Sequence, residues 1–296
     1  MNRFLSTPLA ISGLALALVG PLGCSSSSTN SGTGGTSSTL DLALTGVPAL
    51  GADYVYEGWL IDSDGPHSTG RFSVADDGTP NPSTFQVDAA LAAKASNVVI
   101  TIEPAKGDAP APSATHFLAG PVTNGKADLG VAQGLGVDLS TAKGSFILAT
   151  PSTASDMTDD DQGIWWLVPG ATKTASLELP MPPDGWMYEG WVVGSNGPVS
   201  TGKFTDASGV DSDGTGPAAG KDPGPPFPGQ DFVMPATMLD NSYKAVITVE
   251  PDPDNSPMPF AIKPLVAASI DGTKTAPESQ QMSAGPAMPT GTATIM

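Results

Sequence analysis

The feature of this sequence that most constrains its fold is an internal repeat. A 17-residue segment that begins YEGW at Tyr56 aligns without gaps to a segment that begins YEGW at Tyr188, and 11 of the 17 residues are identical. Such self-similarity indicates that one supersecondary unit is built twice. Any fold proposed for the chain must therefore accommodate two copies of this unit.

A second pair of matching segments follows in the same order. VVITIEP ends at Pro104 and AVITVEP ends at Pro251, and each leads into a proline-rich stretch. The offset between the copies grows from 132 residues (188 minus 56) to 147 (251 minus 104), so the second copy holds 15 additional residues, within 205–231. Short alternating segments at 40–44 and 175–179 precede the copies and predict an opening strand in each.

The composition favours strands and turns over helices. The chain has 35 Gly and 30 Pro, residues that disfavour helix interiors, and 39% hydrophobic residues, enough to fill a core. Two further strands are predicted at 145–149 and 163–168, and two turns of helix at 89–95. We therefore predict an all-β fold with two tandem antiparallel β-sandwich (Ig-like) domains.

Each 17-residue segment predicts a β-hairpin. Asp64-Gly65 and Asn196-Gly197 fall at matching positions between apolar runs, and such dipeptides favour the type I′ turns of two-residue hairpins. Bulky apolar residues occur on both faces of the first strand, which is typical of a central strand.

The first residues resemble a bacterial lipoprotein signal. Arg3 precedes an apolar run at 9–19, and Cys24 follows a small residue at the distance where such signals place the lipidated Cys. An ordinary cleaved signal followed by an incidental Cys is the alternative. We expect a signal peptide at 1–23, a Ser/Gly/Thr tether at 24–38, β domains at 39–150 and 151–276, and a mostly disordered tail at 277–296 apart from a strand at 291–295.

Charge and composition exclude several classes of function. The formal net charge of −18 repels nucleic acids and anionic lipid headgroups. A single Cys and two His leave no set of residues for a structural zinc or iron–sulfur site. The sequence contains no Gly-x-Ser-x-Gly motif, and His67 is replaced by Val199 in the other copy, so a Ser–His pair has no supporting motif. We expect no cofactor and no bound metal.

The order of the motifs YEGW, GPxSTG and VITxEP, followed by a proline-rich stretch, resembles the extracytoplasmic C-terminal domain of anti-sigma-K factors. The resemblance covers most of 39–270, twice over, and implies a β domain outside the cytoplasm. In that family a cytoplasmic helical domain, often with a His and paired-Cys zinc motif, holds the sigma factor. This sequence has no paired Cys, and we expect no helical domain before residue 39. The resemblance therefore implies an outer module without direct sigma-factor binding.

Four glutamates at matching positions raise the question of carboxylate catalysis. A glycosidase needs two carboxyls about 5–10 Å apart across a cleft. The alternative is that each is a structural polar group, with Arg71 and Lys203 as partners. A two-residue turn at 64–65 would pair Glu57 with Phe72, and a one-residue shift would place Arg71 opposite Trp59. We favour the structural interpretation for the whole repeat signature, which comprises Tyr56, Glu57, Trp59, Gly65, Gly70 and Glu103 in the first copy and Tyr188, Glu189, Trp191, Gly197, Gly202 and Glu250 in the second.

Two other groups of residues suggest ligands. The Asp-rich stretches 156–161 and 206–213 supply several carboxylates, but neither follows the EF-hand spacing, and we favour solvated loops over calcium sites. The tryptophans could form a sugar- or peptide-binding platform. We favour core packing for Trp59 and Trp191 and expect Trp186 to be exposed near its Pro-Pro-Asp-Gly turn.

The sequence thus predicts a non-enzymatic, lipid-anchored protein of the cell envelope that acts as a sensing or interaction module. Ser25 after the lipidated Cys predicts the outer membrane, on its periplasmic or surface face. The expected partners are the membrane itself and an envelope protein or polysaccharide. A carbohydrate- or peptide-binding surface protein is the alternative, and a carboxylate-based glycoside hydrolase a weaker one.

Overall fold

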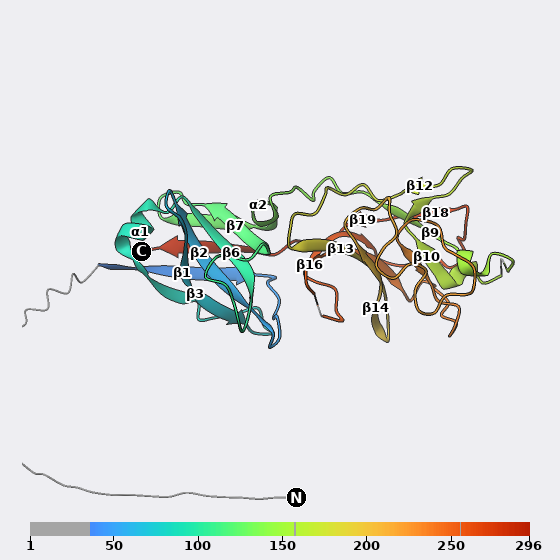
Figure 1. Ribbon diagram of the computed structural model, residues 1–296, viewed down its shortest axis with the longest axis horizontal. Coiled ribbons are helices and arrows are strands. Elements are labelled where there is room, and N and C mark those ends of the chain that lie inside the picture. The colour runs from blue at the N-terminus through green and yellow to red at the C-terminus, as the bar shows by residue number, and fades with distance from the viewer. Residues whose placement is uncertain (1–35, 157, 255) are drawn as a thin grey trace, which may run out of the picture. The chain divides into compact units, whose positions relative to one another are not determined.

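A computed structural model of the chain describes residues 36–156, 158–254 and 256–296 (Figure 1). The expected signal peptide, the lipidation site at Cys24 and the tether up to residue 35 lie outside the described residues. The described part contains no helix that is both long enough and apolar enough to cross a membrane. Its fold is mostly β with large antiparallel sheets, so the predicted all-β class is confirmed.

The first copy of the repeat lies in a nine-stranded sheet. Neighbours in the sheet are antiparallel, and two short helices, α1 (Ala89–Lys94) and α2 (Val131–Leu135), accompany it. The strands, from one edge to the other, are β4 (Pro80–Asn81), β3 (Gly65–Val74), β2 (Tyr54–Asp62), β6 (Asn97–Pro104), β7 (His116–Pro121), β8 (Lys126–Gly130), β20 (Thr290–Ile295), β1 (Ser37–Thr45) and β5 (Thr84–Asp88).

The second copy lies in a five-stranded sheet, and two smaller sheets complete the fold. Two 3₁₀ turns, Pro151–Thr153 and Asp160–Gln162, lie between strands of the smaller sheets. The five-stranded sheet comprises β14 (Gly197–Phe204), β13 (Trp186–Gly194), β16 (Lys244–Pro251), β17 (Ile262–Ala267) and β19 (Ser283–Ala284). The smaller sheets comprise β15 (Gly229–Asp231), β10 (Gly163–Trp165), β9 (Ser145–Leu148) and β18 (Ser279–Gln281), and the pair β11 (Leu167–Val168) and β12 (Thr174–Ala175).

The two copies of the repeat build the same arrangement of four strands. The order β3-β2-β6-β7 in the first sheet corresponds to β14-β13-β16-β17 in the second. In each, the YEGW strand lies between its hairpin partner and the VITxEP strand, as expected of a central strand.

The hairpins differ from the prediction by one residue at the turn. Asp62 pairs with Gly65, so Ser63 and Asp64 form the turn, and the Asp62 side chain accepts a hydrogen bond from the Asp64 backbone N–H at 2.7 Å. A β-bulge between Gly58 and Trp59 then shifts the register again. Neither of the two registers considered from the sequence is observed, because bulge and turn together place Glu57 opposite Arg71.

Glycine is required at the bulge in both copies. Gly202 follows the bulge with a φ of 103°, a conformation that other residues rarely adopt. Across the ladder, a Cβ at Gly190 would lie 2.4 Å from the Thr201 hydroxyl. Gly70 and Gly58 occupy the same positions in the first copy, which explains why these glycines repeat.

One large hydrophobic core extends through both copies. Phe117 on β7 is fully buried and packs against Trp186 and Phe260, with ring centroids 6.3 and 5.5 Å apart. The sequence did not show whether the copies share a core, and these contacts join them. Trp186 is 2% exposed, so its predicted exposure is wrong. The residue begins β13 and packs against both Phe117 and Phe260.

The C-terminal residues return to the first sheet. Strand β20 lies between β1 and β8, and in Figure 1 this red strand lies among the blue and green strands of the first copy. Ala293 on β20 is fully buried and pairs with Leu42 and Ala127. The structure thus differs from two expectations. Residues 277–296, expected to form a mostly disordered tail, contribute three strands. The sheet of the expected domain at 39–150 takes one strand, β20, from beyond residue 150.

Removal of residues 290–296 should destabilise the first sheet. The deletion leaves β1 and β8 without a shared partner and uncovers the core at Ala293, so we expect a loss of roughly 3 kcal/mol or more. Urea denaturation followed by circular dichroism measures it. Met296→Ala, which removes an exposed side chain and keeps the backbone, is the control. A truncated chain that unfolds like the control would contradict the role given to β20.

Candidate functional site

The repeated glutamates lie inside the sheets. Glu57 on β2 and Glu189 on β13 face a basic residue across the hairpin, while Glu103 and Glu250 come just before the proline that ends β6 and β16. The exposed fractions of Glu57, Glu103, Glu189 and Glu250 are 7%, 0%, 3% and 0%. These carboxylates therefore depend on protein partners rather than on water.

In the first copy an arginine joins two carboxylates. Arg71 Nε lies 3.2 Å from Glu57 Oε2, and its Nη2 lies 2.8 Å from Asp108 Oδ2. The same nitrogen donates to the Pro104 carbonyl, and the Ser68 hydroxyl donates to Glu57 Oε1. The planar guanidinium thus ties β2 and β3 to the loop after β6.

In the second copy a lysine occupies the position of Arg71. Lys203 Nζ lies 2.9 Å from Asp254 Oδ2 but 3.9 Å from Glu189 Oε2. The Ser200 hydroxyl donates to Glu189 Oε1, as Ser68 does to Glu57. The two networks correspond residue by residue, yet the lysine contacts its glutamate less closely than the arginine does.

Each copy also contains a Trp–Thr pair beside the second glutamate. Trp59 Nε1 donates to Thr101 Oγ1 at 2.8 Å, and this hydroxyl donates to Glu103 Oε1. Trp191 Nε1 donates to Thr248 Oγ1 at the same distance. The two tryptophans are 2% exposed, so the prediction that they pack in the core is confirmed.

Backbone N–H groups fix the second glutamate of each pair. Ser113 N donates to Glu103 Oε1 and Phe260 N donates to Glu250 Oε1, each at 2.8 Å. The other oxygen, Oε2, has no hydrogen-bond partner in either residue. Burial raises the pKa of Glu103 and Glu189, and it raises the pKa of Glu250 to about 7.

This geometry does not match the cleft that carboxylate hydrolysis requires. A glycosidase aligns two carboxyls on either side of a bound sugar, whereas Glu57 and Glu189 are engaged by a serine and a basic residue within their own hairpins. With exposed fractions of 7% or less, the four glutamates offer no face to a sugar ring.

The Asp-rich loops use their carboxylates locally. Asp156 accepts from the Thr158 N–H, and Asp159 accepts from the hydroxyls of Thr150 and Thr153. Asp211 accepts three backbone N–H groups of the insertion, although burial raises its pKa to about 6. These contacts shape the loops, and Asp211, which is 7% exposed, differs from the solvated residue that the sequence predicted.

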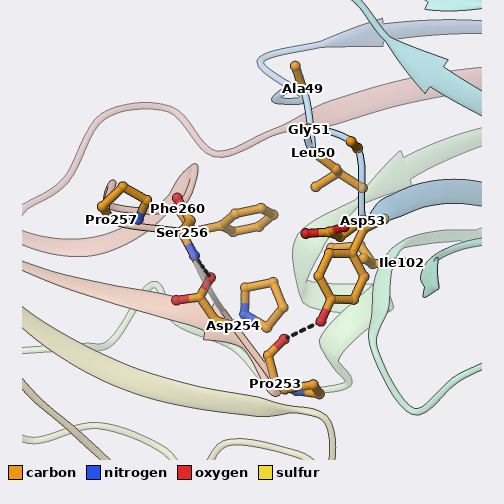
Figure 2. Close-up of a pocket in the computed structure, with 13 residues that line it drawn as sticks. Ala49, Leu50, Gly51, Asp53, Ile102, Pro253, Asp254, Ser256, Pro257 and Phe260 are labelled. Atoms are coloured by element: carbon orange, nitrogen blue, oxygen red, sulfur yellow. Dashed lines mark hydrogen bonds between the residues drawn. The ribbon is translucent and has the colours of Figure 1, made fainter. Parts of the chain in front are cut away.

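A surface cavity lies beside the second network. It has a volume of about 370 Å³ and takes its lining from both copies. Figure 2 shows the Phe260 ring pointing across it toward Leu50 and Asp53. The Tyr54 hydroxyl donates to the Pro253 carbonyl at 3.3 Å. A groove between the two copies was predicted only as the surface of the alternative binding function, without its lining residues. The proline-rich stretch after the second VITxEP segment supplies Pro253 and Pro257 to the lining.

These features define an all-β protein of antiparallel sheets with a duplicated, buried charge network. Residues 26–116 match the family model described as anti-sigma-K factor rskA, C-terminal. The match extends through β6 and includes YEGW and VVITIEP of the first copy, so the predicted resemblance is confirmed for this stretch. Comparisons with curated proteins and with solved structures found no match.

The raised pKa of Glu250 predicts that acidification stabilises the protein. The folded state keeps the proton up to a pKa of about 7, against an ordinary value of 4.5. The stabilisation is therefore complete below the ordinary value and is lost as the pH rises through about 7. The contribution of Glu250 should make the free energy of unfolding greater at about pH 5 than at about pH 8. We expect this difference to be on the order of 3 kcal/mol or less.

Urea denaturation at both pH values, in buffer with a chelator, measures this difference. Glu250→Gln keeps an acceptor for the Phe260 N–H and cannot ionise, so it should reduce the dependence on pH. An equal pH dependence in the variant and the unmodified chain would assign the effect to other groups.

Proposed function

We propose that the protein is a non-enzymatic module of the cell envelope that senses or binds another envelope component. The observation that supports this most is the burial of the four repeated glutamates. They are the groups that the sequence offers for catalysis, and each is held by hydrogen bonds or ion pairs within its own copy of the repeat. The family match agrees with this role, because it concerns the C-terminal part of an anti-sigma factor.

We further propose that the second copy is another domain of the same kind. It lies outside residues 26–116, but it has the same order of four strands and the same Glu–basic–Asp network as the first. A duplicated outer module that is held outside the cytoplasm has no direct access to a sigma factor. It would act as a sensor or accessory component.

Attachment through Cys24 is part of the proposal. The apolar run and the Cys at its end support a lipid anchor. The full chain, expressed in a Gram-negative bacterium, should incorporate labelled palmitate and fractionate with the outer membrane. Cys24→Ala should lose both properties. Label that persists in the variant would contradict the anchor at this residue.

Binding of a peptide or polysaccharide is the second candidate function, and the cavity in Figure 2 favours it. Tyr54, Phe260 and three prolines give the cavity apolar and aromatic walls, which suit peptide or sugar surfaces. The tryptophans do not contribute, because all five are buried.

Capture from intact envelopes tests both functions. The full chain should retain an envelope protein or polysaccharide and should release no hydrolysis product above the buffer background. If the cavity is the binding surface, Tyr54→Ala should weaken retention roughly tenfold through lost aromatic contact. Val199→Ala, an exposed position outside the cavity lining, should not. Product release by the unmodified chain that disappears in Glu57→Gln would overturn the non-enzymatic role.

A further inference from the structure

Three carboxylates converge in the second copy of the repeat. Single oxygens of Glu189, Glu250 and Asp254 all lie within 4.8 Å of one another. No other three acidic, His or Cys side chains in the described part of the chain come together in this way. Calcium binds oxygen at 2.3–2.6 Å, so two oxygens on opposite sides of one ion are about 5 Å apart. The three carboxylates therefore fit around one ion of this size.

Two of these carboxylates have buried oxygens without a hydrogen-bond donor. Glu250 Oε2 and Glu189 Oε2 accept no hydrogen bond, and their residues are 0% and 3% exposed. The nearest cation, Lys203 Nζ, is 3.9 Å from Glu189 Oε2. A buried carboxylate oxygen without a partner is costly, and a bound cation would remove that cost.

The first copy shows how the space between two carboxylates is filled without an ion, although Glu103 Oε2 lacks a hydrogen-bond donor there as well. Arg71 contacts Glu57 at 3.2 Å and Asp108 at 2.8 Å, so its guanidinium occupies the space between the two carboxylates. The three corresponding side chains of that copy do not form a convergent group among the described residues. The ammonium of Lys203 is smaller and makes its short contact with Asp254 alone, at 2.9 Å.

Charge also indicates what the second network lacks. When ionised, Glu189, Glu250 and Asp254 carry three negative charges, and Lys203 supplies one positive charge. Two negative charges remain in a largely buried cluster, because the two further groups that interact electrostatically with it, Lys263 with Glu250 and Asp213 with Glu189, carry opposite charges. One divalent cation would neutralise them, and the all-oxygen donor set is the kind that calcium prefers.

We propose that Glu189, Glu250 and Asp254 bind a divalent cation of the calcium type, with the Lys203 ammonium moving toward its solvent-exposed side. Asp254 also lines the cavity of Figure 2, which gives the ion a route from solvent. Its other oxygen, Oδ1, accepts from the Ser256 N–H at 2.8 Å, so Ser256 is held to the same carboxylate. The ion would fasten this wall of the cavity to β13 and β16. This inference does not depend on the proposed envelope role.

Calorimetric titration of the chelator-treated full chain in detergent with CaCl₂, and separately with MgCl₂, tests the site. We expect one calcium ion to bind and to raise the melting temperature, with weaker binding of magnesium, which requires shorter and more regular coordination. Terbium, a calcium substitute, should luminesce on excitation of tryptophan, because Trp191 is linked to the cluster through Thr248.

Matched variants locate the ion. Glu250→Gln removes a ligand charge, and Lys203→Arg installs the residue of the first copy, so each should weaken calcium binding at least tenfold. Glu103→Gln is the matched control, because it makes the same change in the first copy, where the three carboxylates do not converge. This variant should bind calcium like the unmodified chain. Since arginine is accommodated at the matching position of the first copy, Lys203→Arg remains informative if Glu250→Gln fails to fold.

Two results would overturn the proposal. One is the absence of calcium binding to the unmodified chain at millimolar concentration. The other is equal calcium binding in Lys203→Arg, Glu250→Gln and the unmodified chain, which would place the ion on the exposed Asp-rich loops instead.

Discussion

The structure depends on the burial of a glutamate opposite a basic residue within each hairpin. The carboxylate cannot leave the sheet without exposing the adjacent core, and it cannot remain there without its serine and its Arg or Lys. The β-bulge next to it sets the register that brings Glu57 to Arg71 and Glu189 to Lys203. Sheet geometry and charge pairing therefore require each other, which accounts for the repetition of glycine, glutamate and serine together.

Much of the buried network could be predicted from the sequence, because the two copies of the repeat can be compared with each other. Identical residues at Glu57 and Glu189, with Arg71 and Lys203 at matching positions, predicted the buried network and its partners. The hairpin register was not predicted, because the bulge that Gly58 and Gly70 mark was taken as regular strand and the Asp62 side chain moves the turn. The exposure expected of Trp186 was wrong because its environment is provided by distant residues of both copies.

Comparison of the two networks also distinguishes features that both copies need for their structure from features that belong to one copy. Features present in both copies, such as the Trp–Thr pair and the serine on the first glutamate, belong to the scaffold. The exchange of Arg71 for Lys203 keeps the positive charge and the strand order but lengthens the contact with the facing glutamate from 3.2 to 3.9 Å. In our proposal of a calcium site, this small difference in donor geometry is what distinguishes the second copy from the first.

The return of β20 to the first sheet has a consequence for the order in which the protein folds. A polypeptide that crosses a membrane or leaves the ribosome with its N-terminus first presents β1 and β8 long before residues 290–295 emerge. The backbone N–H and C=O groups of Thr39 and Met296 bond to each other, so the earliest and latest described segments finish adjacent. The first sheet therefore reaches its final pairing only after residues 290–295 have been synthesised, and until then β1 and β8 lack the strand that lies between them.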